Sequence, residues 1–217
     1  MGIAEALAVI FFTSLIVGFS GAMAPGPLSA VNVRDSITKG PKTGLTLSVG
    51  HSLAELMILL VLLLGIGPFL SVNYVEITIG LIGGLVLLYL SYASIHKLKN
   101  VEQVLPQRSG KPSMGKSGIY LGFIVSLANP YFIIWWSTIG LSYISWADNY
   151  GIWGVGCFFI GHITSDFIWN ISVSIAVFQG GKLMSPGVFR IVMVLLNICL
   201  GMLGAYFIFK SLYVYLG

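Results

Sequence analysis

Two similar motifs in the chain combine a histidine with an acidic residue inside apolar sequence. His51 precedes Glu55 by four positions, His162 precedes Asp166 by four, and a glycine stands directly before each histidine. A spacing of four places both side chains on one face of a helix, one turn apart. An imidazole beside a carboxylate can bind, relay and release a proton. We therefore predict that Glu55, Asp166, His51 and His162 couple the protein's activity to protons.

The composition is that of a membrane protein. The chain has 217 residues, of which 57% are hydrophobic and only 8% are charged, whereas charged residues make up about 25% of an average soluble domain. Apolar runs long enough to cross a bilayer recur along the sequence. A carboxylate at bilayer depth costs several kcal/mol, so an acid placed there marks function by default. Glu55 and Asp166 are the two acids that we expect at such depth.

The apolar runs predict an all-α polytopic membrane protein with six transmembrane helices. We expect these helices at about residues 3–33, 43–68, 74–97, 117–146, 151–178 and 187–212. A polar interval rich in Lys, Arg, Pro and Gly follows the third helix. The expected domains are therefore a first three-helix repeat at 1–98, a cytoplasmic linker at 99–116 and a second three-helix repeat at 117–217.

The distribution of basic residues predicts the orientation, because Lys and Arg are in excess on the cytoplasmic side. With the linker inside, ten of the eleven basic residues face the cytoplasm, and Lys210 is the exception. Both termini are then outside a cell (inner) membrane. Three helices per half make the halves inverted copies, and Pro27 and Pro130 occupy corresponding positions in the two halves. Inverted repeats are a common transporter architecture with a site near the bilayer midplane.

Proline motifs predict breaks within the first and fourth helices. One motif contains Pro25, Gly26 and Pro27, and the other contains Asn129 and Pro130. Gly or Asn suits a helix N-cap, and Pro suits the first helical position. The N–H groups of a helix start need a partner in the membrane, and a ligand carboxylate is a natural one. We therefore predict that these five residues bind substrate; the alternative is that the motifs are ordinary kinks.

The same features carry a resemblance to a known family. The Pro-Gly-Pro at 25–27, the glycines Gly40, Gly44 and Gly50 of the second helix, and the Asn-Pro at 129–130 resemble those of the lysine exporter (LysE/RhtB-type) family of amino-acid exporters. The resemblance covers nearly the whole chain. It implies a small inner-membrane exporter of amino acids that is driven by the proton gradient. The role of the histidine–acid pairs is inferred from the residues and not from the resemblance.

We therefore expect an exporter of small amino acids or their derivatives and not an enzyme, with no cofactor motif. Its expected partners are the amino-acid substrate, protons and the lipid bilayer, with no nucleic acid. The pair Gly80-x-x-x-Gly84 allows close helix packing, either within a subunit or in a homo-oligomer. The aromatic residues after Pro130 either wall a substrate cavity or face lipid.

Three alternatives remain open, besides a purely structural role of His51 and His162 as interhelical hydrogen-bonding groups. The first is a divalent metal-ion exporter, in which His51, Glu55, His162 and Asp166 converge on an ion such as Mn²⁺ or Zn²⁺. The second is an intramembrane serine protease, because Ser20 stands in a Gly-x-Ser-Gly sequence. The third is a thiol–disulfide carrier, which would need Cys157 and Cys199 to face each other.

Overall fold

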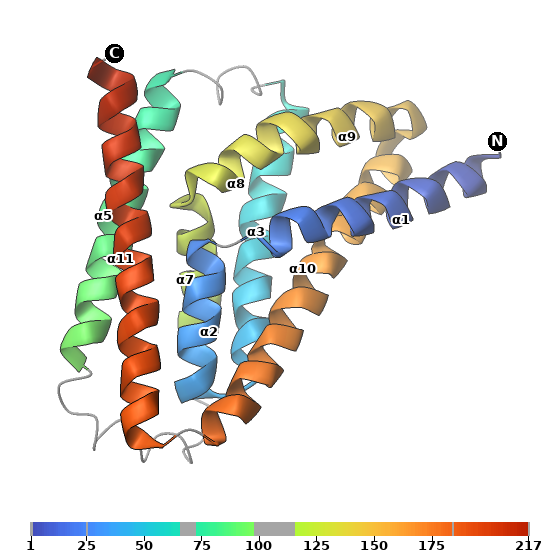
Figure 1. Ribbon diagram of the computed structural model, residues 1–217. Coiled ribbons are helices and arrows are strands. Elements are labelled where there is room, and N and C mark those ends of the chain that lie inside the picture. The colour runs from blue at the N-terminus through green and yellow to red at the C-terminus, as the bar shows by residue number, and fades with distance from the viewer. Residues whose placement is uncertain (1, 25, 66–72, 98–115, 184, 217) are drawn as a thin grey trace.

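The computed structural model describes residues 2–24, 26–65, 73–97, 116–183 and 185–216, and every element within them is helical (Figure 1). The elements are α1 (Ile3–Ala22), α2 (Pro27–Lys39), α3 (Thr43–Leu63), α5 (Asn73–Lys97), α7 (Lys116–Leu127), α8 (Pro130–Trp135), the π-helical turn η3 (Trp136–Gly140), α9 (Leu141–Ala147), the 3-10 turn η4 (Asp148–Tyr150), α10 (Gly151–Lys182) and α11 (Pro186–Leu216).

The helices are those of a multi-pass membrane protein. Within the described residues, four helical stretches are long and apolar enough to cross a membrane, namely Ile3–Ala22, Thr43–Leu63, Pro130–Gly181 and Arg190–Tyr213. Shorter apolar stretches run through α5 and α7 at Ile77–Ala93 and Ser117–Leu127. The six-helix inverted repeat stays a prediction, as does the division into domains, because nearly all of the predicted linker lies outside the described residues.

Both predicted helix breaks are present. The helix α1 ends at Ala22 and α2 begins at Pro27, with Gly26 as an extended N-cap residue. The helix α7 ends at Leu127 and α8 begins at Pro130. A proline at the first position of a helix has no N–H to leave unpaired and is already set to the helical φ angle. The prolines therefore start new helices rather than bend continuous ones.

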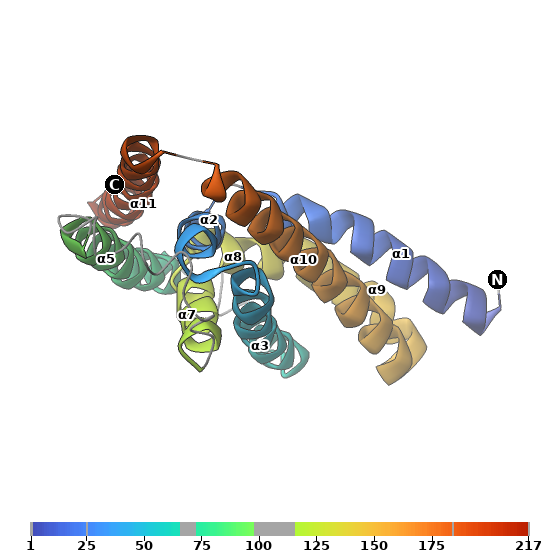
Figure 2. The same ribbon diagram turned by 90° about the horizontal axis from the view of Figure 1, so that it is seen from below.

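The helices pack in three pairs that extend over much of their lengths. The helix α5 lies beside α11, α1 lies against α10, and α3 lies against α7 (Figures 1 and 2). The start of α1 and the end of α11 lie toward one end of the molecule, and the α2–α3 turn lies at the other end (Figure 1). The first part of each broken helix thus packs against the helix that carries the opposite histidine–acid motif: α1 against α10, and α7 against α3.

The glycine of each motif permits this close approach. A Cβ atom on Gly50 of α3 would collide with the backbone carbonyl of Ile119 on α7. A Cβ atom on Gly161 of α10 would collide in the same way with the carbonyl of Phe11 on α1. The two motifs therefore use their glycines equally, each to bring one helix against its neighbour.

The glycines of α5 pack within the chain. A Cβ atom on Gly84 would lie 2.6 Å from the carbonyl oxygen of Gly204 on α11, and one on Gly204 would lie 2.7 Å from that of Gly84. Close packing at Gly84 therefore joins α5 to α11 of the same chain. The homo-oligomer stays a prediction.

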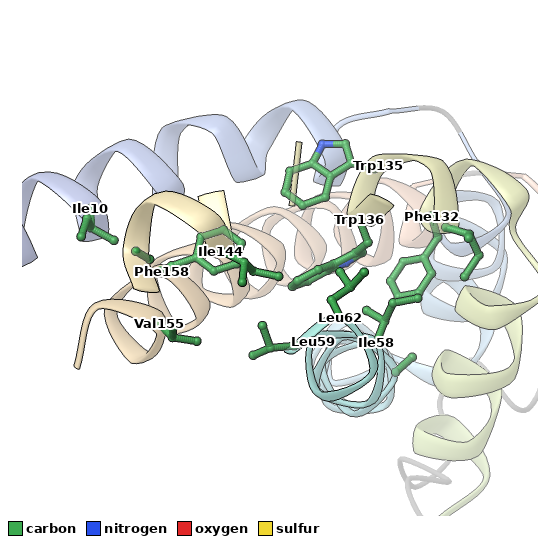
Figure 3. Close-up of a cluster of buried hydrophobic side chains, with 13 residues drawn as sticks. Ile10, Ile58, Leu59, Leu62, Phe132, Trp135, Trp136, Ile144, Val155 and Phe158 are labelled. Atoms are coloured by element: carbon green, nitrogen blue, oxygen red, sulfur yellow. The ribbon is translucent and has the colours of Figure 1, made fainter. Parts of the chain in front are cut away.

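The largest hydrophobic core fills the space where α3, the segment from α8 to α9, and α10 meet. Its side chains include Ile10, Ile58, Leu59, Leu62, Phe132, Trp135, Trp136, Ile144, Val155 and Phe158 (Figure 3). Trp135 lies beside α1, whereas Trp136 lies over α3 (Figure 3). Phe132, Trp135 and Trp136 thus pack between helices and form one wall beside the histidine–acid motifs, whereas Tyr131 is exposed.

Candidate functional site

The two motifs meet and form one buried polar group, which we call the His-acid cluster: His51, Glu55, His162 and Asp166. Glu55 Oε1 lies 2.7 Å from His162 Nε2 and 3.4 Å from His51 Nε2. Asp166 lies farther from both rings, with Oδ1 3.8 Å from His51 Nε2 and Oδ2 3.7 Å from His162 Nε2. The four-residue spacing predicted that each histidine pairs with the acid of its own helix. The packing of α3 on α10 adds contacts between the two helices.

The cluster leaves several buried polar atoms without a partner. Glu55 and Asp166 are only 1% and 2% exposed. Among the described residues, no hydrogen-bond partner contacts Glu55 Oε2, Asp166 Oδ2 or His162 Nδ1. Buried polar atoms are nearly always paired, with protein, water or ligand, because an unpaired one is costly. The free oxygens are therefore places where a proton or a cationic group of a ligand can bind.

The ring of His51 is oriented by a serine of α7. His51 Nδ1 lies 2.6 Å from Ser126 Oγ, and this hydroxyl donates to the carbonyl of Gly122 at 2.6 Å. A hydroxyl has one hydrogen, so Ser126 Oγ accepts from the N–H at Nδ1 of His51. In neutral His51 this leaves the lone pair on Nε2, which faces Glu55 and Asp166. His51 thus presents a proton acceptor to the two acids.

The ring of His162 is held by aromatic packing instead. It stacks on Trp135 at a centroid distance of 4.4 Å and meets Trp136 edge-on at 5.3 Å. A third ring, that of Phe158, stacks at 6.1 Å. Gly18 of α1 is next to Nδ1, since a Cβ atom on it would lie 3.0 Å from that nitrogen. A glycine has no side chain that could bond Nδ1 as Ser126 bonds His51.

One cavity of about 240 Å³ joins the His-acid cluster to both helix breaks. All four cluster residues line it, together with Gly26 and Pro27 at the first break and Asn129 at the second. Pro130 begins α8 but is not among the lining residues, and Pro25 lies outside the described residues. The cavity therefore brings the four predicted proton-coupling residues together with three of the predicted substrate-binding residues, Gly26, Pro27 and Asn129.

The two helix starts differ in how they are capped. The side-chain oxygen of Asn129 accepts a hydrogen bond of 3.1 Å from the N–H of Tyr131, so α8 is capped by its own chain. No side chain of the described residues caps the start of α2, where Gly26 is the N-cap residue. The start of α2 is therefore the better place for an external carboxylate.

Sequence reasoning missed several residues of the site, among them Ser126 and Asn170. Asn170 lines the cavity, and its carbonyl accepts a hydrogen bond of 2.9 Å from Asn32 Nδ2 on α2. Four residues later, Ser174 Oγ lies 2.7 Å from Ser36 Oγ of α2. The signal was available for Asn170 and Ser174, because both continue the spacing of four that relates His162 to Asp166. Nothing local in the sequence pairs Ser126 with His51.

The structure also places the residues that a metal-ion exporter, a thiol–disulfide carrier or a serine protease would use. One ligand atom from each of His51, Glu55 and Asp166 lies within 4.8 Å of the other two, so these groups do converge. Cys157 is half-buried on α10 and Cys199 is exposed on α11, and both are free thiols. The exposed hydroxyl of Ser20 donates to the carbonyl of Val17 in its own helix at 2.6 Å.

Comparison with known proteins agrees with the predicted family. The family model described as LysE type translocator matches residues 19–211. The chain is 27% identical over 211 residues to the "Putative amino acid efflux protein YcgF" of Bacillus subtilis (strain 168), which covers 96% of this chain and 99% of that protein. It is 23% identical over 161 residues to the "Chemotactic transduction protein ChpE" of Pseudomonas aeruginosa, covering 74% and 78% of the two chains. No solved structure matches it.

Proposed function

The chain belongs to the LysE type translocator family, and from this premise we propose that it exports small amino acids from the cell in exchange for protons. The observation that carries this proposal is the single cavity shared by the His-acid cluster and the two helix breaks. A substrate in that cavity can contact the start of α2 and the buried acids at the same time. Transport, rather than enzymatic catalysis, is the activity that the family supports.

An amino acid carries the two charged groups that this cavity can bind. Its carboxylate complements the start of α2, because a helix N-terminus carries unpaired N–H groups and a partial positive charge. Its ammonium group complements the free oxygens of Glu55 and Asp166. Broken helices bind substrate carboxylates in this way in other transporters.

Proton coupling follows from competition for the acids. A buried carboxylate can be neutralised by a proton or by an ammonium group, and both use the same oxygens. Substrate binding then releases a proton, and protonation releases the substrate. Because the proton and the substrate cannot be bound at the same time, one binds as the other leaves. Such exchange is what export driven by inward proton movement requires.

Asp166 is the better candidate for the acid that exchanges the proton. Glu55 Oε1 lies 2.7 Å from His162 Nε2, which is a hydrogen-bond distance. The ring nitrogens nearest to Asp166 lie 3.7 and 3.8 Å away, beyond such a bond. Glu55 therefore has a fixed partner, whereas Asp166 depends on a proton or a substrate.

The test is transport into and out of proteoliposomes that contain the purified protein. Asp166→Asn and Glu55→Gln keep side-chain size and remove titration. We expect at least one of them, and Asp166→Asn first, to abolish uphill efflux driven by a pH gradient while substrate exchange without a gradient continues. Asp148→Asn is the matched control, because Asp148 is exposed on η4. Full pH-driven transport by both Asp166→Asn and Glu55→Gln would leave the acids with a structural role only.

The carboxylate contact has its own test in the same vesicles. Amides and decarboxylated amines of transported amino acids should be poor substrates, because each lost hydrogen bond to a charged group costs about 1–3 kcal/mol. An amine that moves as fast as its parent amino acid would rule out carboxylate binding at the start of α2.

A divalent cation is the second candidate substrate, because His51, Glu55 and Asp166 converge. Ligands of one zinc ion lie about 2.0–2.2 Å from the metal, and so within about 4.4 Å of each other. The ligand atoms here lie within 4.8 Å of one another. The N–H donors of one ammonium group point about 110° apart, so two acceptors at about 2.9 Å from the nitrogen are about 4.7 Å from each other. The spacing of the cluster therefore suits an ammonium group, and the family favours an amino acid over a metal ion as the substrate. Vesicles that move Zn²⁺ or Mn²⁺ but no amino acid would reverse this ranking.

We also propose that both termini face outward. Cysteines introduced at Ser113 and Asn149, in a chain without Cys157 and Cys199, report the two sides. A membrane-impermeant thiol reagent added to intact cells should label position 149 and not position 113. The opposite pattern would invert the topology and the direction of the site.

A further inference from the structure

The cavity is apolar on the side that faces α11. This helix contributes Leu203, Tyr206 and Phe207, and Tyr131 and Phe132 line the cavity from α8. The described residues that line the cavity include two carboxylates, Glu55 and Asp166 of the His-acid cluster, and no lysine or arginine. Apart from the phenol groups of Tyr131 and Tyr206, this wall therefore offers contacts to an apolar group, and among the described residues it carries no ionised side chain that could pair with a charge.

The two acids act as one binding point for a cation. A ligand atom from each of Glu55, Asp166 and His51 lies within 4.8 Å of the others, so one ammonium group can contact all three. The free oxygens Glu55 Oε2 and Asp166 Oδ2 belong to side chains that are almost fully buried. A second ammonium group, separated from the first by the methylenes of a diamino acid, would lie against the α8–α11 wall, where the described lining residues include no further carboxylate to pair with it.

The cavity likewise offers one place for a carboxylate. The start of α2 lines it through Gly26, Pro27, Leu28 and Ser29, and this start is not capped by any side chain in the part of the chain that the structure describes. The start of α8 is occupied by the Asn129 side chain. A second carboxylate, as in an acidic amino acid, would lack a cationic partner. Burying an unpaired charge costs far more than burying an apolar side chain gains.

We infer that the substrate is a monoamino, monocarboxylic acid with an uncharged, apolar side chain. Its carboxylate lies at the start of α2, its ammonium group lies at Glu55 and Asp166, and its side chain lies between α8 and α11. The inference rests on the proposed amino-acid export and narrows its substrate class. The cavity discriminates mainly against charged side chains and less between apolar side chains of different size, because one methylene changes the binding free energy by only about 1–3 kcal/mol.

The experiment measures self-exchange across proteoliposomes for five amino acids, each labelled in turn: leucine, methionine, phenylalanine, lysine and glutamate. We expect the three apolar amino acids to exchange at least tenfold faster than lysine and glutamate. Faster exchange of lysine or glutamate would overturn the inference while leaving amino-acid export in place. Exchange of none of the five, with the protein folded, would contradict the proposed function itself.

Ligand-induced thermal stabilisation of the purified wild-type protein gives a second readout that needs no variant. A ligand that binds the folded state raises the melting temperature, and at equal concentration the tighter ligand raises it more. Leucine or phenylalanine should raise it more than lysine or glutamate at equal concentration. Stabilisation by lysine alone would contradict the apolar subsite.

A charge placed in the apolar wall should reverse the selection. Leu203→Asp adds a carboxylate to the α11 side of the cavity, and we expect exchange of lysine relative to leucine to rise at least tenfold. Leu203→Asn is the matched control, because it adds polarity without charge and should leave lysine excluded. An equal gain in both variants, or no gain with Leu203→Asp in a folded protein, would place the substrate side chain elsewhere.

Discussion

The two histidine–acid motifs have nearly the same sequence but different surroundings. A serine hydroxyl from α7 fixes the Nδ1 atom of His51, whereas stacking on Trp135 holds the ring of His162. His51 thus has a defined hydrogen-bonding state, and His162 has a defined position with a free Nδ1 among the described residues. Similar motifs in two halves of a chain therefore need not perform the same task.

The two acids also have different surroundings, and the acid that is held by a histidine is held by the histidine of the other motif. The histidine of the second motif holds the acid of the first, since His162 Nε2 lies 2.7 Å from Glu55 Oε1. Asp166 has no histidine within hydrogen-bond distance. The difference suggests a division in which His162 and Glu55 form a fixed pair, while Asp166, faced by His51 Nε2, exchanges the proton.

The largest effect is expected where the motifs are alike, at their glycines. Gly50→Ala and Gly161→Ala each drive a methyl group into a backbone carbonyl of the neighbouring helix. Such overpacking costs about 1–3 kcal/mol or more, so both variants should lower the melting temperature and the yield of folded protein. Gly156→Ala on α10 is the matched control, because nothing lies within 4 Å of its Cβ position. Normal stability of either motif variant would show that the close approach is not required.

Replacing the two histidines one at a time should have different effects. His162→Gln removes the imidazole that stacks on Trp135 and whose Nε2 lies 2.7 Å from Glu55 Oε1, which should cost about 1–3 kcal/mol of stability. His51→Gln should cost less stability but should alter the pH dependence of efflux. Thermal unfolding and efflux at several pH values measure the two effects. The reverse assignment, with His51 supporting stability and His162 setting the pH profile, would contradict the division of tasks.

The smallest effect is expected from the serine that orients His51. Ser126→Ala removes the acceptor for His51 Nδ1 and lets the ring exchange its two neutral forms. We expect folding to be retained and the pH profile of efflux to shift or broaden, with little change in substrate exchange. Ser142→Ala is the control, because the exposed Ser142 also donates to its own helix, at the Thr138 carbonyl. Identical pH profiles for Ser126→Ala and the wild type would remove Ser126 from the coupling mechanism.

Features that depend on neighbouring residues were predictable from the sequence. Pro27 and Pro130 start new helices because a proline affects only its own turn and the one before it. The pairing of His51 with Glu55 on one helical face follows from a spacing of four. Both predictions needed no knowledge of how distant segments pack.

Features that depend on distant segments were not predictable. The contact between His162 and Glu55 joins residues 107 positions apart, and it exists because α3 and α10 pack together. The difference between the helix starts was also hidden, because Asn129 and Gly26 are both suitable N-cap residues. Only the structure shows that the side chain of Asn129 occupies the start of α8.

The most direct test of the account is whether substrate binding releases a proton from Asp166. Purified protein in weakly buffered solution with a pH-sensitive dye is mixed with the best substrate of the exchange panel, and binding is measured by calorimetry in the same preparation. The account predicts proton release by the wild type and by Glu55→Gln. It predicts binding without proton release by Asp166→Asn, in which Glu55 still accepts the ammonium group. Undiminished proton release by Asp166→Asn, or loss of substrate binding in that folded variant, would contradict it.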